Sequence, residues 1–171
     1  DLTGSGPWSA VSPRVRLARL STTRGLSGSW LDPDYVFTYL DEGEAAFILE
    51  RKRYRLKAGD ALIMPPRLRH VVLSADSRPL TQFVAHFDLF PPSPATGQRV
   101  AKRERLLVSP PVVSLGPAAR EAVRQAFLRL HETLRSGRPW RTLEAKGLMA
   151  QLIALVLDAA AEVTAVRPAA A

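Results

Sequence analysis

The sequence predicts a mainly β fold, a barrel or sandwich of short strands, followed by two C-terminal helices. Two observations predict it. Between about residues 13 and 90, short segments alternate apolar and polar residues and are separated by turn formers, which is typical of antiparallel strands. After residue 116, apolar residues recur every three or four positions instead, which indicates amphipathic helices.

The N-terminal part predicts an arm, one strand and a loop. Residues 1–12 are rich in Gly, Ser and Pro, and Trp8 is their one large side chain, so we expect an extended arm. The first strand is expected in PRVRLARLSTT, residues 13–23, and a loop in TTRGLSGSWLDPD, residues 22–34, because the latter is full of turn formers.

The following strands are marked by alternation and by turns at residues 41–43, at Arg51-Lys52 and in KAGD, residues 57–60. Residues 35–40 show the alternation most clearly, with Tyr35, Phe37 and Tyr39 on one face. The expected strands are YVFTYL (35–40), AAFILE (45–50), RYRL (53–56), ALIM (61–64), HVVLS (70–74), LTQFVAHFDLF (80–90) and PVVSL (111–115).

Two helices are expected at the C-terminal end. The first spans residues 117–137 and ends at Gly137. Its apolar face holds Ala122 or Val123, Phe127, Leu130 and Leu134. The second runs from about residue 140 to 163 and carries an apolar stripe at heptad-like spacing, formed by Leu148, Leu152, Leu155 and Ala159.

Composition narrows the class of protein. The 171 residues suffice for one domain with a full core. The absence of cysteine excludes disulfides, Cys-rich zinc sites and thiol nucleophiles. The formal charge of +8 fits either a nucleic-acid partner or an ordinary basic surface, and the lack of aromatics among the basic clusters favours the surface.

The sequence predicts neither a membrane span nor a secretion signal. The longest apolar stretch, residues 148–161, is interrupted by Gln151 and Asp158 and is too short to span a bilayer. The first ten residues lack the basic-then-apolar pattern of a signal peptide. We therefore expect a cytoplasmic location.

The most specific motif is GDALIMPPRLRH, residues 59–70. Gly59 supplies a tight turn between two short strands. Pro65 and Pro66 end the second of these strands because they offer no ladder donors. His70 then begins the next strand, at the mouth or the inner wall of the predicted barrel.

With this spacing of Gly59, Pro65 and His70, the segment resembles the second conserved motif of cupins, although Arg67 and Ser74 replace that motif's glycine and asparagine. The wider run from residue 34 to 73 and the AHF of residues 85–87 resemble the N-terminal effector-binding and dimerisation domain of AraC-family transcription regulators. The resemblance covers about residues 12–90.

This resemblance implies a cupin-like fold, a double-stranded β-helix or jelly-roll barrel followed by two helices. Residues 1–115 would form the arm and the effector-binding barrel, and residues 116–166 a helical pair for dimerisation. A helix-turn-helix DNA-binding domain is expected after residue 171, since residues 116–171 do not resemble one. The protein would then be a regulator of transcription that contacts DNA only through that further domain.

A metal centre is not expected. Metal-binding cupins supply two histidines and a glutamate before the first glycine; counting back from Gly43, these positions fall near Trp30 and Asp32 and on Val36. Only His70, and conceivably Asp32, remain as ligands, whereas a catalytic metal needs about three. We therefore expect no cofactor and no enzymatic activity. The alternatives are a metal-dependent cupin enzyme, such as an isomerase or dioxygenase, and a scaffold whose barrel is filled by side chains.

A ligand site follows partly from alternation and partly from the resemblance. Gln82, Val84 and His86 share one face of their strand, and His86 is either a hydrogen-bonded interior residue or an effector contact. The resemblance implies that this strand and the one with His70 line the effector cavity, and that the arm closes over it, as in arabinose-responsive relatives. The expected ligand-binding residues are Trp8, His70, Val72, Gln82, Val84 and His86. His131 is expected on the surface.

A homodimer is the expected assembly. The stripe Leu148, Leu152, Leu155 and Ala159 would form its interface, with small residues at 159–161 allowing close approach of a partner helix. The rival interpretation is that this stripe packs only on its own barrel.

Overall fold

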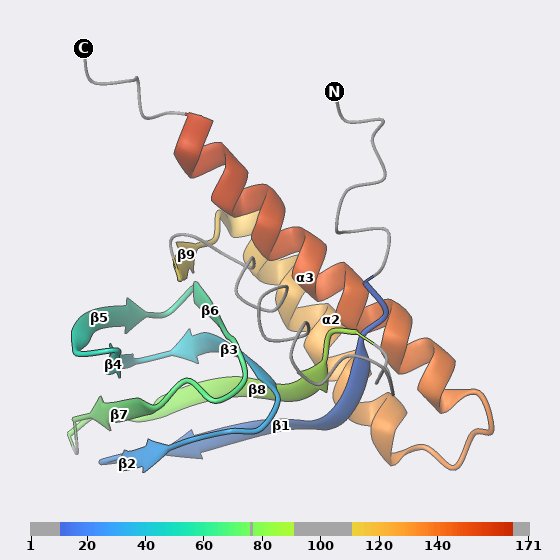
Figure 1. Ribbon diagram of the computed structural model, residues 1–171, viewed down its shortest axis with the longest axis horizontal. Coiled ribbons are helices and arrows are strands. Elements are labelled where there is room, and N and C mark those ends of the chain that lie inside the picture. The colour runs from blue at the N-terminus through green and yellow to red at the C-terminus, as the bar shows by residue number, and fades with distance from the viewer. Residues whose placement is uncertain (1–10, 76, 91–110, 166–171) are drawn as a thin grey trace.

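The computed structural model describes residues 11–75, 77–90 and 111–165 and contains nine strands and two helices in these ranges (Figure 1). The elements are β1 (Arg14–Thr23), β2 (Ser27–Trp30), β3 (Tyr35–Glu42), β4 (Glu44–Leu49), β5 (Lys52–Lys57), β6 (Asp60–Met64), β7 (His70–Ser74), β8 (Leu80–Asp88), β9 (Val112–Ser114), α2 (Pro117–Arg135) and α3 (Arg141–Ala165).

The strands form two antiparallel sheets, one of five strands in the order β1-β8-β3-β6-β9 and one of four in the order β2-β7-β4-β5. The predicted fold class, a cupin-like β fold followed by two helices, is confirmed. The two sheets face each other but do not join into one closed barrel. Helices α2 and α3 cover the side of the five-stranded sheet that faces away from the other sheet (Figure 1).

Two details of the strand prediction were wrong. The expected loop at residues 22–34 contains β2, whose Trp30 pairs with His70 of β7. Backbone pairing with β7 overrides the weak strand propensity of Gly28 and its serine neighbours. The turn between β4 and β5 lies at Glu50-Arg51 rather than one residue later, because Leu49 pairs with Lys52.

The five-stranded sheet separates two hydrophobic cores. In β3, residues 35–40 are all buried because both faces of the strand are covered. Tyr35, Phe37 and Tyr39 belong to the core under the helices, whereas Val36 and Leu40 belong to the core between the sheets. Alternation along one strand therefore assigns its residues to two different environments.

The helices attach to this sheet through aromatic contacts and through α3. The Phe127 ring of α2 lies between Phe37 and Phe83, with ring centroids 5.4 Å and 5.3 Å away. Leu148 and Leu152 of α3 are buried in the same core. Neither helix is long and apolar enough to cross a membrane, within the part of the chain that the structure describes.

The stripe expected to form a dimer interface therefore has another place in this chain. Leu148, Leu152 and Ala159 are buried in the core between α3 and the sheet, and Leu155 is partly buried against it. The rival interpretation, in which the stripe packs on its own barrel, describes their position. They are not on the free face of α3.

His131 is likewise not a free surface residue. Its Nδ1 lies 3.0 Å from the carbonyl oxygen of Ala18, and the ring is partly buried. Because a carbonyl oxygen can only accept, Nδ1 carries the proton and donates. This hydrogen bond connects α2 to the edge strand β1.

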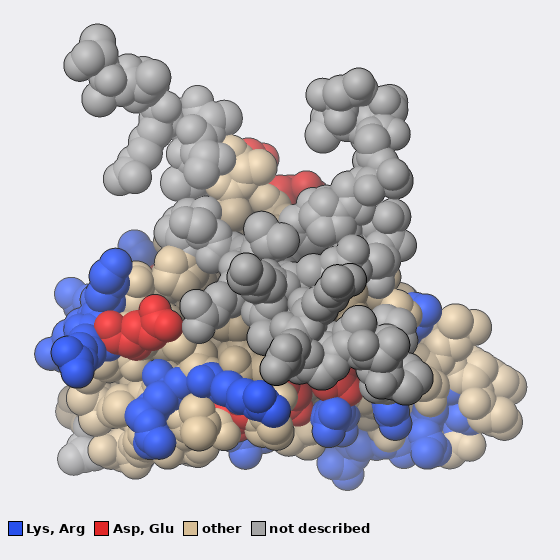
Figure 2. All heavy atoms as spheres, in the orientation of Figure 1, with Lys and Arg blue, Asp and Glu red and all other residues tan. Residues whose placement is uncertain are grey.

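Basic side chains gather along the edge strand β5, at the end of the molecule where Figure 2 shows a group of Lys and Arg. Lys52, Arg53, Arg55 and Lys57 are all exposed there, and Arg55 pairs with Glu44 of β4 at 2.6 Å. This hydrogen bond lowers the pKa of Glu44. Charged side chains on an edge strand disfavour its pairing with strands of other chains. This role explains the basic residues of β5 without a nucleic-acid partner.

Gly59 occupies the turn that the sequence predicts, for two reasons. Its φ of +91° lies in the region that favours glycine, and a side chain there would collide with the guanidinium of Arg120. Arg120 itself donates from Nε to the carbonyl oxygen of Leu115, at 2.7 Å. The turn before β6 therefore packs directly on the start of α2.

Arg67 adopts the left-handed conformation, with φ of +60°, at the position where the cupin motif has glycine. In the folded state, the left-handed conformation costs a residue with a side chain about 1–2 kcal/mol more than it costs glycine. Glycine, however, loses more conformational entropy on folding, which offsets part of this difference. Arg67→Gly is therefore expected to raise the free energy of unfolding by about 0.5–1 kcal/mol. Urea denaturation measures it. Arg69 does not have a positive φ, so Arg69→Gly should lower the free energy of unfolding. An equal decrease of this free energy in both variants would contradict the explanation given for Arg67.

Candidate functional site: a pocket between the two sheets

A cavity of about 70 Å³ lies between the two sheets. Five of the six expected ligand-binding residues line it: His70, Val72, Gln82, Val84 and His86. Trp8, the sixth, lies outside the described residues. The other lining residues are Arg19, Leu26, Trp30, Asp32, Val36, Thr38, Phe47 and Met64.

The strand register explains why residues distant in sequence meet here. On β8, Gln82, Val84 and His86 point to the same face because alternate residues do so. Val84 is flanked by Arg19 on β1 and Thr38 on β3. Val36 and Thr38 were foreseeable from the alternation of β3, whereas Arg19 was not, since nothing in β1 tells which of its faces turns inward.

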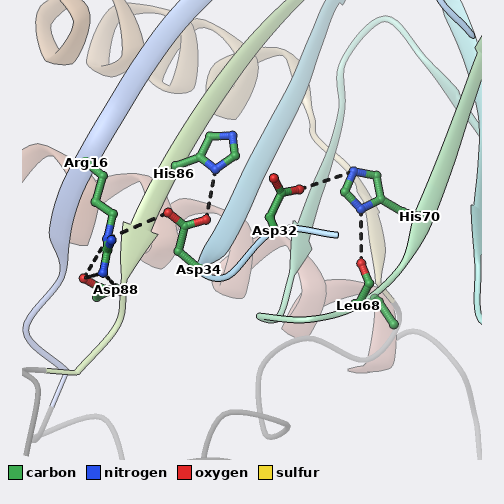
Figure 3. Close-up of polar contacts among 7 residues, drawn as sticks. All are labelled: Arg16, Asp32, Asp34, Leu68, His70, His86 and Asp88. Atoms are coloured by element: carbon green, nitrogen blue, oxygen red, sulfur yellow. Dashed lines mark hydrogen bonds and ion pairs between the residues drawn. The ribbon is translucent and has the colours of Figure 1, made fainter. Parts of the chain in front are cut away.

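His86 makes the strongest polar contact at the site (Figure 3). Its Nδ1 lies 3.0 Å from Oδ1 of Asp34, a carboxylate that is 5% exposed. Arg16 holds the same carboxylate more loosely, at 3.8 Å, and pairs with Asp88 at 2.9 Å. His86 is thus both an interior hydrogen-bonding residue and a pocket residue. Its Nδ1 is engaged, so only Nε2 is left for a contact in the pocket.

His70 is held by three neighbours. Its Nδ1 donates to the carbonyl oxygen of Leu68 at 3.2 Å, and its Nε2 lies 3.7 Å from Oδ2 of Asp32 (Figure 3). The indole of Trp30 stacks on the ring, with centroids 5.9 Å apart. These neighbours fix the orientation of the ring. His70 is therefore a fixed part of the pocket wall and does not rotate freely to donate a hydrogen bond.

These two histidines fasten one segment to both sheets. Asp32 and Asp34 lie on the short connection between β2 and β3. His70 comes from the four-stranded sheet and His86 from the five-stranded sheet. A change at either histidine is therefore transmitted to the segment between residues 31 and 34.

The donor set does not build a metal centre. Among residues 11–75, 77–90 and 111–165, no three His, Asp, Glu or Cys side chains gather where they could hold a metal ion. Near two of the positions that metal-binding cupins use for ligands, the structure places Trp30 and Val36 in the pocket wall. Neither side chain offers a metal an oxygen or imidazole donor.

The comparisons with known proteins agree with this geometry. A family model described as the AraC-like ligand binding domain matches residues 29–153, more than half of the chain. The chain belongs to this family. The match runs from β2 into α3, so the AraC-like ligand-binding domain includes both the strands around the pocket and the helices packed behind them.

A search of the curated proteins finds no match to this AraC-like domain. Among solved structures, it is similar to a cupin superfamily protein from Desulfitobacterium hafniense DCB-2, with 17% identity over 44% of this chain and 68% of the other and a TM-score of 0.40. It is also similar to a "predicted oxalate decarboxylase" from Thermotoga maritima, with 24% identity over 45% of this chain and 69% of the other, also at 0.40. Likenesses this distant carry no argument about activity.

Proposed function

We propose that this chain is the sensing domain of an AraC-family transcription regulator and that it binds a small metabolite in the pocket between its sheets. The observation that carries the proposal is the pocket itself, most of whose lining residues, all except Arg19 and Leu26, lie within residues 29–153 that match the AraC-like ligand-binding family. Its wall combines apolar side chains with polar ones at fixed places, and such a combination can bind and orient a small molecule.

Under this proposal the chain contacts DNA only through a helix-turn-helix domain that follows it. Neither described helix resembles a recognition element, since α2 and α3 pack face to face on the sheet as core-forming helices. The charged edge strand β5 would contribute, at most, contacts that do not depend on base sequence.

We further propose a homodimer that uses the outward face of α3. Leu143, Gly147, Ala150 and Ala154 are exposed and follow one another at spacings of four, three and four residues. This spacing places them on one stripe, opposite the buried Leu152. Small residues allow two helices to approach closely, and a side chain at Gly147 would meet open space. This stripe replaces the buried one as the candidate interface.

Val84→Trp tests the pocket. The indole is expected to fill the cavity, so that a metabolite found by thermal-shift screening of the native chain no longer binds to the variant by calorimetry. Val71→Trp is the matched control, because Val71 lies on the face of β7 opposite to Val72 and does not line the pocket. Unchanged affinity in Val84→Trp would place the ligand elsewhere and overturn the proposal.

The alternative, a metal-dependent cupin enzyme, makes an opposite prediction about metal content. A regulator of the proposed kind needs no resident metal, whereas the enzyme would retain about one ion per chain and lose it in His70→Ala. Elemental analysis of the purified protein and of this variant separates the two functions.

A further inference from the structure

Two buried polar side chains face the pocket without a partner. Thr38 and Gln82 are 2% and 6% exposed and both line the cavity. Neither side chain makes a hydrogen bond to another residue in the described parts of the chain. Because both line the cavity, their polar groups are expected to bond water or a ligand there.

A cation stands next to them. Arg19 on β1 and Thr38 on β3 both lie opposite Val84 on the intervening strand, and Gln82 is the next residue of β8 on the same face. Adjacent strands lie about 5 Å apart, so Arg19 and Thr38 flank Val84 at about 10 Å from each other, a distance that the long arginine side chain can span. Arg19 is exposed at the edge of the sheet and pairs with no acidic group among the described residues.

The acidic groups near Arg19 each lie beside a histidine instead. Asp32 lies 3.7 Å from His70, and Asp34 lies 3.0 Å from His86. Arg16, the other arginine on this part of β1, is occupied by Asp88. Among the lining residues that the structure describes, Arg19 is therefore an arginine without an acidic partner, and it can bind a negatively charged group.

The rest of the wall suits an apolar body. The side chains of Val36, Phe47, Met64, Val72 and Val84 line the cavity and belong to the core between the sheets. A ligand that fits both the polar group around Arg19 and the apolar wall has one acidic group and a compact apolar remainder. A cavity of about 70 Å³ holds on the order of five water molecules, which limits the fully buried part to a few carbon atoms.

We infer that the metabolite is a small organic monocarboxylate, whose carboxylate accepts hydrogen bonds from Arg19, Thr38 and Gln82 at the mouth of the pocket. This inference rests on the proposed function and adds the chemical class of the ligand. An arginine, a hydroxyl and an amide are suitable donors for a carboxylate, and the guanidinium contributes a charge-assisted, bidentate contact.

The test uses two pairs of probes that differ only in charge, butyrate with butyramide and benzoate with benzamide, titrated into the protein by calorimetry or NMR at millimolar concentrations. The acid of at least one pair is expected to bind about tenfold more tightly than its amide, because only the acid accepts charge-assisted hydrogen bonds. Arg19→Gln should abolish this preference. Arg53→Gln, an exposed arginine on the remote edge strand β5, should leave it unchanged.

Thr38→Val separates ligand binding from structural support. Because the hydroxyl has no partner within the described protein, valine is expected to leave the melting temperature unchanged or higher while weakening acid binding several-fold. A lower melting temperature with unchanged acid affinity would show that the hydroxyl serves the fold instead.

The remaining outcomes distinguish the two proposals. Equal binding of acid and amide, or no binding of either, overturns the inference; if neutral metabolites bind and Val84→Trp blocks them, the proposed function still stands. If the acids bind preferentially but Val84→Trp does not weaken them, the carboxylate site lies outside the pocket and both proposals fail.

Discussion

Replacing Leu152 with glutamate is expected to unfold the protein. Leu152 is fully buried in the core between α3 and the five-stranded sheet. Truncation of such a leucine alone costs about 2–5 kcal/mol, and a buried carboxylate without a partner adds to this loss. The sum approaches the total stability of an ordinary domain, about 5–15 kcal/mol. Circular dichroism and urea denaturation of the variant measure the loss.

Ala154→Glu is the matched control, with the same new side chain on the exposed face of the same helix. It should remain folded at urea concentrations that unfold Leu152→Glu, and it should lose only the stability that the proposed dimer contacts add. A folded, monomeric Leu152→Glu variant would instead show that this residue lies in an interface between copies, and the packing of α3 on its own sheet would then be wrong.

The same Ala154→Glu substitution is expected to dissociate the proposed homodimer. In a two-fold symmetric interface, each copy contributes the same patch, so the variant brings two carboxylates together on facing helices. Like charges and loss of close helix packing should raise the dissociation constant at least about 100-fold, which corresponds to about 3 kcal/mol. Sedimentation equilibrium or light scattering after size exclusion measures the change.

Ala118→Glu on α2 controls for the added charge, because Ala118 is also exposed and lies on the other helix. It should leave the dimer intact. Dimers of native strength in Ala154→Glu would place the interface elsewhere, and a monomeric native protein would remove α3 as a dimerisation element.

The sequence predicted the elements that local pattern determines. Alternation in β3 and β8 indicated which residues share a face, and the spacing from Gly59 to His70 predicted the turn and the start of β7. β2 escaped prediction because its residues, Ser27–Trp30, are turn formers whose strand conformation depends on pairing with β7.

Which stripe of α3 is buried also depends on contacts that the local pattern does not show. The helix carries two stripes at heptad-like spacing, one through Leu152 and one through Ala150 and Ala154. Periodicity identifies both stripes, but only the packing against β1 and α2 decides which is buried. The more hydrophobic stripe became the core, as the hydrophobic effect favours.

The pocket was predictable in its histidines but not in their partners. Asp34 and His86 are 52 residues apart, and no periodicity connects a loop residue to a strand residue. Arg19 belongs to an edge strand whose exposed leucines, Leu17 and Leu20, obscure the alternation. Contacts of this kind follow from sheet order and register, which the sequence does not display locally.

The five-stranded sheet is the only layer between the pocket and the helices in the described structure. In the proposed regulator, a bound metabolite would therefore act on the helices through this one layer. Along β8, the even-numbered residues Gln82, Val84 and His86 face the pocket, while Phe83 on the other side contacts Phe127 of α2. Successive residues of β8 therefore alternate between contacting the pocket and contacting the helices. Substitutions that abolish sensing should fall at the even-numbered positions, and those that leave binding intact but silence the output should fall at Phe83 and Phe127.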